Sequence, residues 1–539
     1  MKKIIKYLFL LTGGSFILAS CNDFLDREPL DSVTPDNFFF TENDLAAYAV
    51  KHYNFTTHEG FNAGIWKNDN ATDNQAATDY DKKWIPGQWK VPEAYDNPAS
   101  NDPWYFSTIR EANYFLETVV PRFEKGEIEG SETNIKHYIG EMYFLRAKNY
   151  LSKLETFGDF PIIKNTLPDE SESLIQASKR APRYKVAHFI LEDLDQAISL
   201  LTNNISGGKN RITKNAALLL KSRAALFEAS WLTYHKGTAL VPGGPGWPGK
   251  AEDIADFNID TEIAFFLKEA KAAAKEVIGN AALVQNTAKD CMDETVKTDE
   301  DKYKMSNPYF AQFSANSLEG YSEILMWRAY NLLDYKIVHS APFYIRVGGN
   351  TGFTRQYVES FLCRDGKPIY ATDQYKGDES LLNVRKNRDL RLQLFLMTPG
   401  ETLSPNVMNG TPDLLPEVPQ LLDITEKRCV TGYQVRKGLS GNWYRDGNTA
   451  IEGCPVYRAA EAYLNYIEAD CMEHNGTSIG SEAAGYWGDL RERAGLPRDY
   501  TVTVNNTDLS KELDWAIYSA GKLVSPLLYN IRRERRCEL

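Results

Sequence analysis

The sequence predicts a mostly α-helical protein, built from tetratricopeptide-like helical hairpins with a loop-rich irregular region covering one side. Two observations support this prediction. Apolar residues recur every three or four positions along several segments, which places them on one face of an amphipathic helix. This periodicity fades between about residues 280 and 450, where glycine and proline are scattered among short apolar runs. Paired helices of this kind bury their apolar faces only by stacking on one another.

The chain has 539 residues, which is too many for one compact core and enough for a large domain with sub-regions. We expect four parts: a signal peptide at 1–20, a helical region at 21–280, a loop-rich excursion at 281–450, and further helices at 451–539. Loops on a rigid scaffold are where binding residues concentrate, so the excursion is the expected ligand-binding region.

The composition is that of a folded protein and argues against nucleic acid as a partner. Hydrophobic residues make up 43% and charged residues 25% of the chain. The net charge of −12 is unfavourable for phosphate binding, which needs a surplus of lysine and arginine. The chain also contains 30 tyrosines and 10 tryptophans, which suit either core packing or stacking on ligands.

Residues 1–21 have the pattern of a bacterial lipoprotein signal. Lys2, Lys3 and Lys6 form a positive start, and the apolar run from Tyr7 to Ala19 is too short for a permanent membrane span. The run ends in Leu-Ala-Ser-Cys at Cys21, which resembles a lipobox. We therefore expect cleavage before Cys21 and lipidation of its thiol and amine, which would anchor the protein stably. The alternative is an ordinary signal peptide that happens to precede a cysteine.

Six amphipathic helices are predicted along the chain. They are expected around 45–53, 104–119, 138–157, 187–201, 215–231 and 261–278. The helix at 138–157 buries an apolar stripe that includes Tyr150 and Leu154 and leaves Arg146 on another face. Gly158 follows its last apolar residue, where glycine readily adopts the left-handed conformation that ends a helix. Regular helix is expected to return at Pro455–Cys471 and again near 485–495 and 529–539.

Several stretches closely resemble the SusD/RagB family in order along the chain. They include FLRAKNYLSKLETFGDFPII, which begins at Phe144, PVYRAAEAYLNYIEAD, which begins at Pro455, and GYWGDLRERAGLP, which begins at Gly485. Members of this family are lipid-anchored, nutrient-binding proteins on the outer membrane of Bacteroidota. The resemblance implies capture of a glycan at the cell surface and its transfer to a SusC-like TonB-dependent transporter.

The final block, YNIRRERRCEL, resembles a family helix that continues into a further segment containing arginine and tryptophan. Ile531, Arg535 and Leu539 are spaced as in a helix that is still in progress, and no glycine, asparagine or proline follows to end it. We therefore expect that the C-terminal helical region is truncated. The alternative is a short member of the family whose last helix frays in solvent.

Nothing in the sequence predicts catalysis, a metal site or a cofactor. No HExxH motif and no CxxC pair is present. The cysteines beyond Cys21 are expected to be small buried residues, with one disulfide left open. The group Asn387-Arg388-Asp389-x-Arg391 is interpreted as a structural ion-pair and capping cluster. We expect a binding protein rather than an enzyme.

Sugar binding needs flat aromatic rings for C–H faces and polar side chains for hydroxyl groups. Tryptophans in a polar loop are candidate platforms, together with aromatic and polar residues of the excursion. The candidate ligand-binding residues are Trp66, Asn68, Trp84, Trp89, Asn101, Arg328, Tyr330 and Asn331. Two alternatives stay open: a protein of the same fold that binds peptide or another non-glycan nutrient, and, with less support, a hydrolase.

Overall fold

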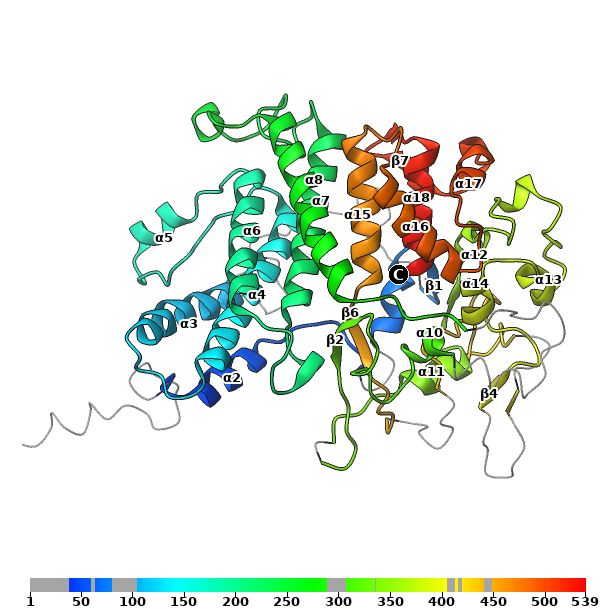
Figure 1. Ribbon diagram of the computed structural model, residues 1–539, viewed down its shortest axis with the longest axis horizontal. Helices are drawn as coiled ribbons and strands as arrows, with labels where there is room; N and C mark the ends of the chain where they lie inside the picture. The colour runs from blue at the N-terminus through cyan, green and yellow to red at the C-terminus, as the bar shows by residue number, and fades with distance from the viewer. Residues whose placement is uncertain are drawn as a thin grey trace, which may run out of the picture.

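The computed structural model describes residues 38–59, 64–79, 104–287, 307–334, 336–404, 413–414, 419–440 and 448–539. Helices predominate in these residues, which confirms the predicted mostly helical fold (Figure 1). Cys21, Trp84, Trp89 and Asn101 lie outside the described residues.

Most of the long helices form one continuous stack that runs across the molecule (Figure 1). Each helix contacts the next in the order α3, α4, α6, α7, α8 and α15, and α15 also contacts α16 and α18. Their bounds are Ser107–Glu124 for α3, Glu132–Phe157 for α4, Arg183–Leu200 for α6, Lys214–His235 for α7, Ile259–Asn280 for α8, Ala460–Glu473 for α15, Ser481–Arg493 for α16 and Pro526–Glu538 for α18. Two shorter helices, α2 (Glu42–Lys51) and α5 (Ser171–Ala177), lie at the α3 end of the stack.

Helix α4 ends as its sequence predicts. Gly158 has a φ of +72°, and its N–H donates to the carbonyl of Leu154 at 3.0 Å. Tyr150 and Leu154 are 0% and 1% exposed, so the predicted stripe does face the core. The Tyr150 hydroxyl also accepts a hydrogen bond from the Ile163 N–H at 2.8 Å, which fixes the extended segment that follows the helix.

Helices α7 and α8 pack together through small side chains. The buried face of α7 carries five alanines that are almost completely inaccessible, and that of α8 carries three. Alanine lets two helix backbones approach closely and has the highest intrinsic helix propensity. The alanine-rich segment at 215–231 therefore forms the tight helix contact that its composition predicts.

The position of Arg146 differs from the prediction. Its side chain is buried rather than exposed on a polar face of α4. The guanidinium makes two hydrogen bonds of 2.7 Å to the Asp193 carboxylate of α6 and donates to the Asn113 amide oxygen of α3 at 2.9 Å. A buried charge needs a partner with matching geometry, and the partner comes from a helix 47 residues further along the chain.

The predicted helix at Pro455–Cys471 begins later than expected. Residues Cys454–Arg458 form strand β6, which pairs antiparallel with β2 (Ile324–Arg328), and α15 starts at Ala460. The pairing places Pro455 opposite Trp327. A short apolar run is ambiguous between helix and strand, and here the choice depends on a partner strand far away in sequence.

The region after α8 consists of short helices and two-stranded pairings rather than long hairpins. Its helices are α10 (Pro308–Ala311), α11 (Ala341–Val347), α12 (Arg355–Ser360), α13 (Leu381–Arg385) and α14 (Leu390–Phe395). Three apolar clusters separate from the main core lie among the described residues of this region, around Phe310 and Phe395, around Phe361 and Val435, and around Leu318 and Trp327. Strand β3 (Thr351–Phe353) pairs with β1 (Gln75–Ala77) and so joins the region to the N-terminal part of the chain.

The C-terminal part adds α17 (Thr501–Asn505) and the strand pair β7 (Tyr518–Ser519) and β8 (Lys522–Leu523). A further short pair is formed by β4 (Thr402–Ser404) and β5 (Asp413–Leu414). The five cysteines in the described residues are buried free thiols, as expected of small core residues. Among the described residues, no helix is both long enough and apolar enough to cross a membrane.

Shortening Leu154 to alanine should destabilise the protein by about 2–5 kcal/mol, because the change opens a cavity at a buried helix contact. Urea unfolding of Leu154→Ala and wild type measures the difference. Leu422→Ala is a matched control, since Leu422 is 93% exposed and its loss should change the free energy of unfolding by less than about 0.5 kcal/mol. Equal effects of the two substitutions would show that α4 does not bury this face.

Candidate functional site

Two of the sequence-predicted residues, Trp66 and Asn68, lie on a 3₁₀ helix, η1 (Ile65–Ala71). Trp66 is half-buried and lines a cavity of about 340 Å³, whereas Asn68 is exposed. This volume falls in the range of small-molecule sites. The cavity lies between η1, the loop-rich region and the start of α15, and its lining includes His58, Trp66, Asp69, Gln75, Arg223, Phe313, Phe353, Tyr357, Phe395, Lys437, Arg458 and Glu461.

A network of side-chain hydrogen bonds holds η1 against the β1–β3 strand pair. The Gln75 side-chain nitrogen has two hydrogens to donate and lies 3.0 Å from the Trp66 carbonyl, 2.9 Å from the Asn70 amide oxygen and 2.7 Å from the Thr351 hydroxyl. The single hydrogen of the Thr351 hydroxyl is within reach of two acceptors, the Asn70 amide oxygen and the Ala76 carbonyl. Because Gln75 is buried, breaking this network would leave unpaired polar groups, so Trp66 is held at a fixed position.

The Trp66 ring packs in parallel with Tyr344 of α11, with ring centroids 6.3 Å apart and planes inclined by 15°. The Lys67 ammonium lies over both rings, 5.0 Å from the Trp66 centroid and 5.6 Å from that of Tyr344. Gly349 makes this arrangement possible, since a Cβ there would lie 2.3 Å from the indole and its φ is +57°. The site thus contains a tryptophan whose ring plane is set by its neighbours.

The indole N–H of Trp66 is buried and has no hydrogen-bond partner among the described residues. A buried donor without a partner costs free energy, and such groups in native proteins call for an explanation. Because this nitrogen has almost no accessible surface, the cavity offers a ligand the ring of Trp66 rather than its N–H. The aromatic walls offer C–H contacts to the same ligand, and the Asp69 carboxylate can accept a hydroxyl hydrogen bond.

The other predicted group, Arg328, Tyr330 and Asn331, lies behind the cavity rather than on its wall. Tyr330 is 7% exposed, and its hydroxyl donates to the carbonyl of His58 at 2.6 Å. The exposed Arg328 guanidinium lies 5.5 Å from the Tyr330 ring centroid. The Asn331 amide oxygen accepts the N–H groups of Leu333 and Asp334 and so stabilises a turn. This group supports His58, which does line the cavity.

Three charged residues of the cavity wall, Arg223, Arg458 and Glu461, are held by ion pairs. Arg223 makes two hydrogen bonds to Glu461, at 2.6 and 2.7 Å. Burial alone raises the pKa of Glu461, but Arg223 holds the pKa below its ordinary value, so the carboxylate stays ionised. Burial lowers the pKa of His58 to about 3, which keeps its ring neutral. Sequence reasoning missed these residues and the aromatic wall, because they come from segments that only the fold brings together.

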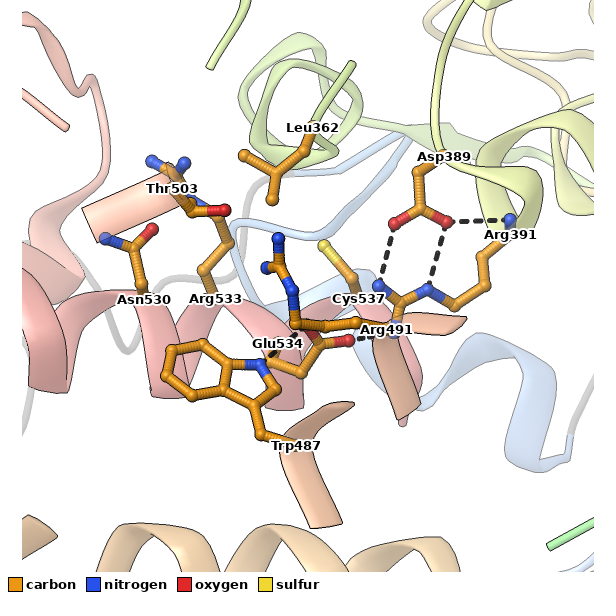
Figure 2. A pocket seen from close by; sticks show the side chains of 10 residues that line it. All are labelled: Leu362, Asp389, Arg391, Trp487, Arg491, Thr503, Asn530, Arg533, Glu534 and Cys537. Atoms are coloured by element: carbon orange, nitrogen blue, oxygen red, sulfur yellow. Dashed lines mark hydrogen bonds and ion pairs between the residues drawn. The ribbon is translucent and has the colours of Figure 1, made fainter. Parts of the chain in front are cut away.

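A smaller cavity next to α18 is structural. Its lining residues are Leu362, Asp389, Arg391, Trp487, Arg491, Thr503, Asn530, Arg533, Glu534 and Cys537 (Figure 2). Its volume of about 10 Å³ leaves room for roughly one water molecule. Arg391 pairs with Asp389 at 2.7 Å and with Glu534 at 2.5 Å, and Asp389 also accepts the backbone N–H of Arg391, the second residue of α14. The interpretation as an ion-pair and capping cluster is confirmed for Asp389 and Arg391, whereas Arg388 donates to the carbonyls of Val358 and Phe361.

No group of three or more histidine, cysteine, aspartate or glutamate side chains in the described part of the chain is arranged to hold a metal ion. The cavity at Trp66 offers a ligand aromatic faces and charged side chains.

Two family models match the sequence. The model described as "SusD family" matches residues 296–539, and the model described as "Starch-binding associating with outer membrane" matches residues 23–226. Together they span most of the chain on both sides of the central region. The chain belongs to the SusD/RagB family.

Relatives and solved structures agree with this assignment. SusD-like protein P38 of Formosa agariphila is 27% identical over 203 residues, which cover 37% of each chain. SusD-like protein P2 of the same organism is 26% identical over 258 residues, which cover 47% of this chain and 45% of the relative. This chain thus matches less than half the length of either curated relative. A SusD-like protein and a SusD-like carbohydrate binding protein, both of Bacteroides fragilis, share the fold with TM-scores of 0.58 and 0.60. They are 21% and 18% identical, and the matches cover 95% and 93% of this chain and 86% and 84% of theirs.

Proposed function

We propose that this protein is a cell-surface lipoprotein that binds an oligosaccharide in the cavity at Trp66 and passes it to a SusC-like TonB-dependent transporter. The observation that carries the proposal is the half-buried Trp66 ring on the wall of a cavity of about 340 Å³. Sugar C–H faces suit the aromatic walls, and the Asp69 carboxylate can accept a hydrogen bond from a sugar hydroxyl.

Family membership supports the same class of ligand and the same location. One matching model is described as starch-binding and associated with the outer membrane, and one structural neighbour is described as a carbohydrate binding protein. The lipobox-like sequence ending at Cys21 supports a lipid anchor. A transporter partner is proposed from the family resemblance of the sequence.

Binding of peptide or another non-glycan nutrient is the second candidate function, because Arg458, Lys437 and Asp69 give the cavity charged groups that a peptide could pair with. Hydrolysis is disfavoured by the state of Glu461. A general acid for glycoside cleavage needs a raised pKa, whereas the Arg223 pair holds that of Glu461 below its ordinary value.

Replacing Trp66 by alanine should abolish oligosaccharide binding or weaken it at least about tenfold, which corresponds to roughly 1.4 kcal/mol. The melting temperature is measured for each variant as well, because Trp66→Ala also removes the packing of the ring on Tyr344 and should lower it. Titration calorimetry with maltoheptaose, cellohexaose and a tryptic peptide mixture measures the loss. The wild-type dissociation constant is expected to be on the order of micromolar to millimolar.

Trp515→Ala is the matched control, because Trp515 is 79% exposed and does not line the cavity. Trp66→Phe keeps an aromatic ring of smaller area, and should lose part of the affinity. Glycan binding that is unchanged in Trp66→Ala would contradict the site. Binding of peptides alone would favour the second candidate, and reducing sugar released by the pure protein would contradict a purely binding function.

Replacing Cys21 by alanine should move the protein from the membrane fraction to the soluble fraction, because the acyl chains would have no attachment point. Fractionation of cells followed by immunoblotting measures this shift. Ser20→Thr, which leaves the thiol in place, serves as a control. A Cys21→Ala variant that stays in the outer membrane would contradict lipid anchoring, and resistance of the wild type to protease added to whole cells would contradict surface exposure.

A further inference from the structure

A second and larger cavity, of about 780 Å³, lies at the opposite end of the helical stack from the C-terminal helices. It is enclosed by the start of α3, the extended segment after α4, and α5. Its walls include the apolar side chains of Trp104, Phe106 and Leu174 and the charged side chains of Arg110, Arg180 and Asp169. None of these residues lines the cavity at Trp66.

The two arginines give this cavity an unusual charge. Neither Arg110 nor Arg180 forms an ion pair with a carboxylate among the described residues. By contrast, the nearby Arg146 and Arg183 are each paired with a buried carboxylate. Asp169 is the one acidic residue among the described lining residues, so the wall carries a net positive charge on a protein whose overall charge is −12.

The positions of these groups are set by surrounding structure. The Arg180 guanidinium lies 5.0 Å from the centroid of the Trp104 ring, a contact that orients the cation without neutralising it. The buried Asn113 side chain donates to the carbonyls of Ile163 and Asn165, at 2.8 and 3.2 Å, and so holds the extended wall in place. The cavity is therefore formed before any ligand arrives, which lowers the entropic cost of binding.

The start of α3 adds to the positive potential. Phe106, Ile109 and Arg110 all line the cavity, so the first turn of this 18-residue helix borders it. That turn has no side-chain cap and no acidic residue. The backbone N–H groups at a helix start carry partial positive charge and favour a nearby anion.

We propose that this cavity is a second binding site, which takes a carboxylate-bearing saccharide unit such as a uronate. The carboxylate pairs with the Arg110 and Arg180 guanidinium groups, whose planar donors match its two oxygens. The C–H face of the sugar ring lies against Phe106 and Leu174. This proposal rests on the proposed function in one respect, namely that the ligand is a saccharide. It differs in placing the acidic sugar units of the ligand in a site separate from the cavity at Trp66.

Titration calorimetry of the full chain with trigalacturonate tests the proposal. The double variant Arg110→Gln/Arg180→Gln should weaken binding at least about tenfold, since it removes both guanidinium groups that pair with the carboxylate. Both side chains are exposed, so the melting temperature should not change. Lys179→Gln removes one neighbouring exposed charge outside the cavity and should leave the affinity unchanged.

Three comparisons separate this site from the one at Trp66. Neutral galactotriose should bind the α3–α5 cavity far more weakly than trigalacturonate, and higher salt should weaken trigalacturonate binding. Trp66→Ala should keep trigalacturonate affinity even if it loses neutral glycans. The proposal is overturned if trigalacturonate does not bind, if the double variant binds it normally, if Trp66→Ala abolishes it, or if triglutamate binds more tightly through the same two arginines.

Discussion

A buried network of charges centred on Glu538 joins the loop-rich region to the helical stack. Glu538 at the end of α18 pairs with Arg458 of β6 at 3.0 Å, with Arg493 of α16 at 2.8 Å and with Arg391 of α14 at 3.3 Å. The Tyr309 hydroxyl of α10 donates to the same carboxylate at 3.0–3.1 Å. Burial alone raises the pKa of Glu538, but the three guanidinium groups hold it well below its ordinary value. Four elements that are distant in sequence are thereby fixed to one carboxylate.

The network affects the free energy of unfolding mainly through the penalty for removing one of its charges. A buried ion pair often adds little stability compared with a well-packed apolar contact, but removing one partner costs about 3–5 kcal/mol because the remaining charge is uncompensated. Arg493 and Arg458 also share Glu323, at 2.6 and 2.7 Å, so the network continues to the start of β2. An arrangement in which each charge has several partners tolerates only one relative placement of α10, α14, α16 and α18. The cavity at Trp66 depends on that placement, since Arg458 and Phe395 form part of its wall.

Local patterns in the sequence predicted the helical stack well and the site only in part. The stripes of α4, α6, α7 and α8 follow from apolar spacing within one segment, and Gly158 marks the end of α4. The strand β6 could not be predicted, because Pro455 is extended only through pairing with β2. Trp66 was identifiable as a tryptophan in a polar loop. Its stacking on Tyr344 and its unpaired N–H depend on residues almost 280 positions away, which no local pattern reveals.

Hydrogen exchange monitored by mass spectrometry, on wild type and Glu538→Gln, tests most directly whether the Glu538 network holds the two parts of the molecule together. The variant should lose amide protection in α14, α16 and α18 together, because Arg391, Arg458 and Arg493 would lose their shared partner. Helices α4 and α6, which lie outside the network, should keep their protection. Unchanged protection in α14 of the variant would contradict the account, since it would show that the loop-rich region is held to the stack by other contacts.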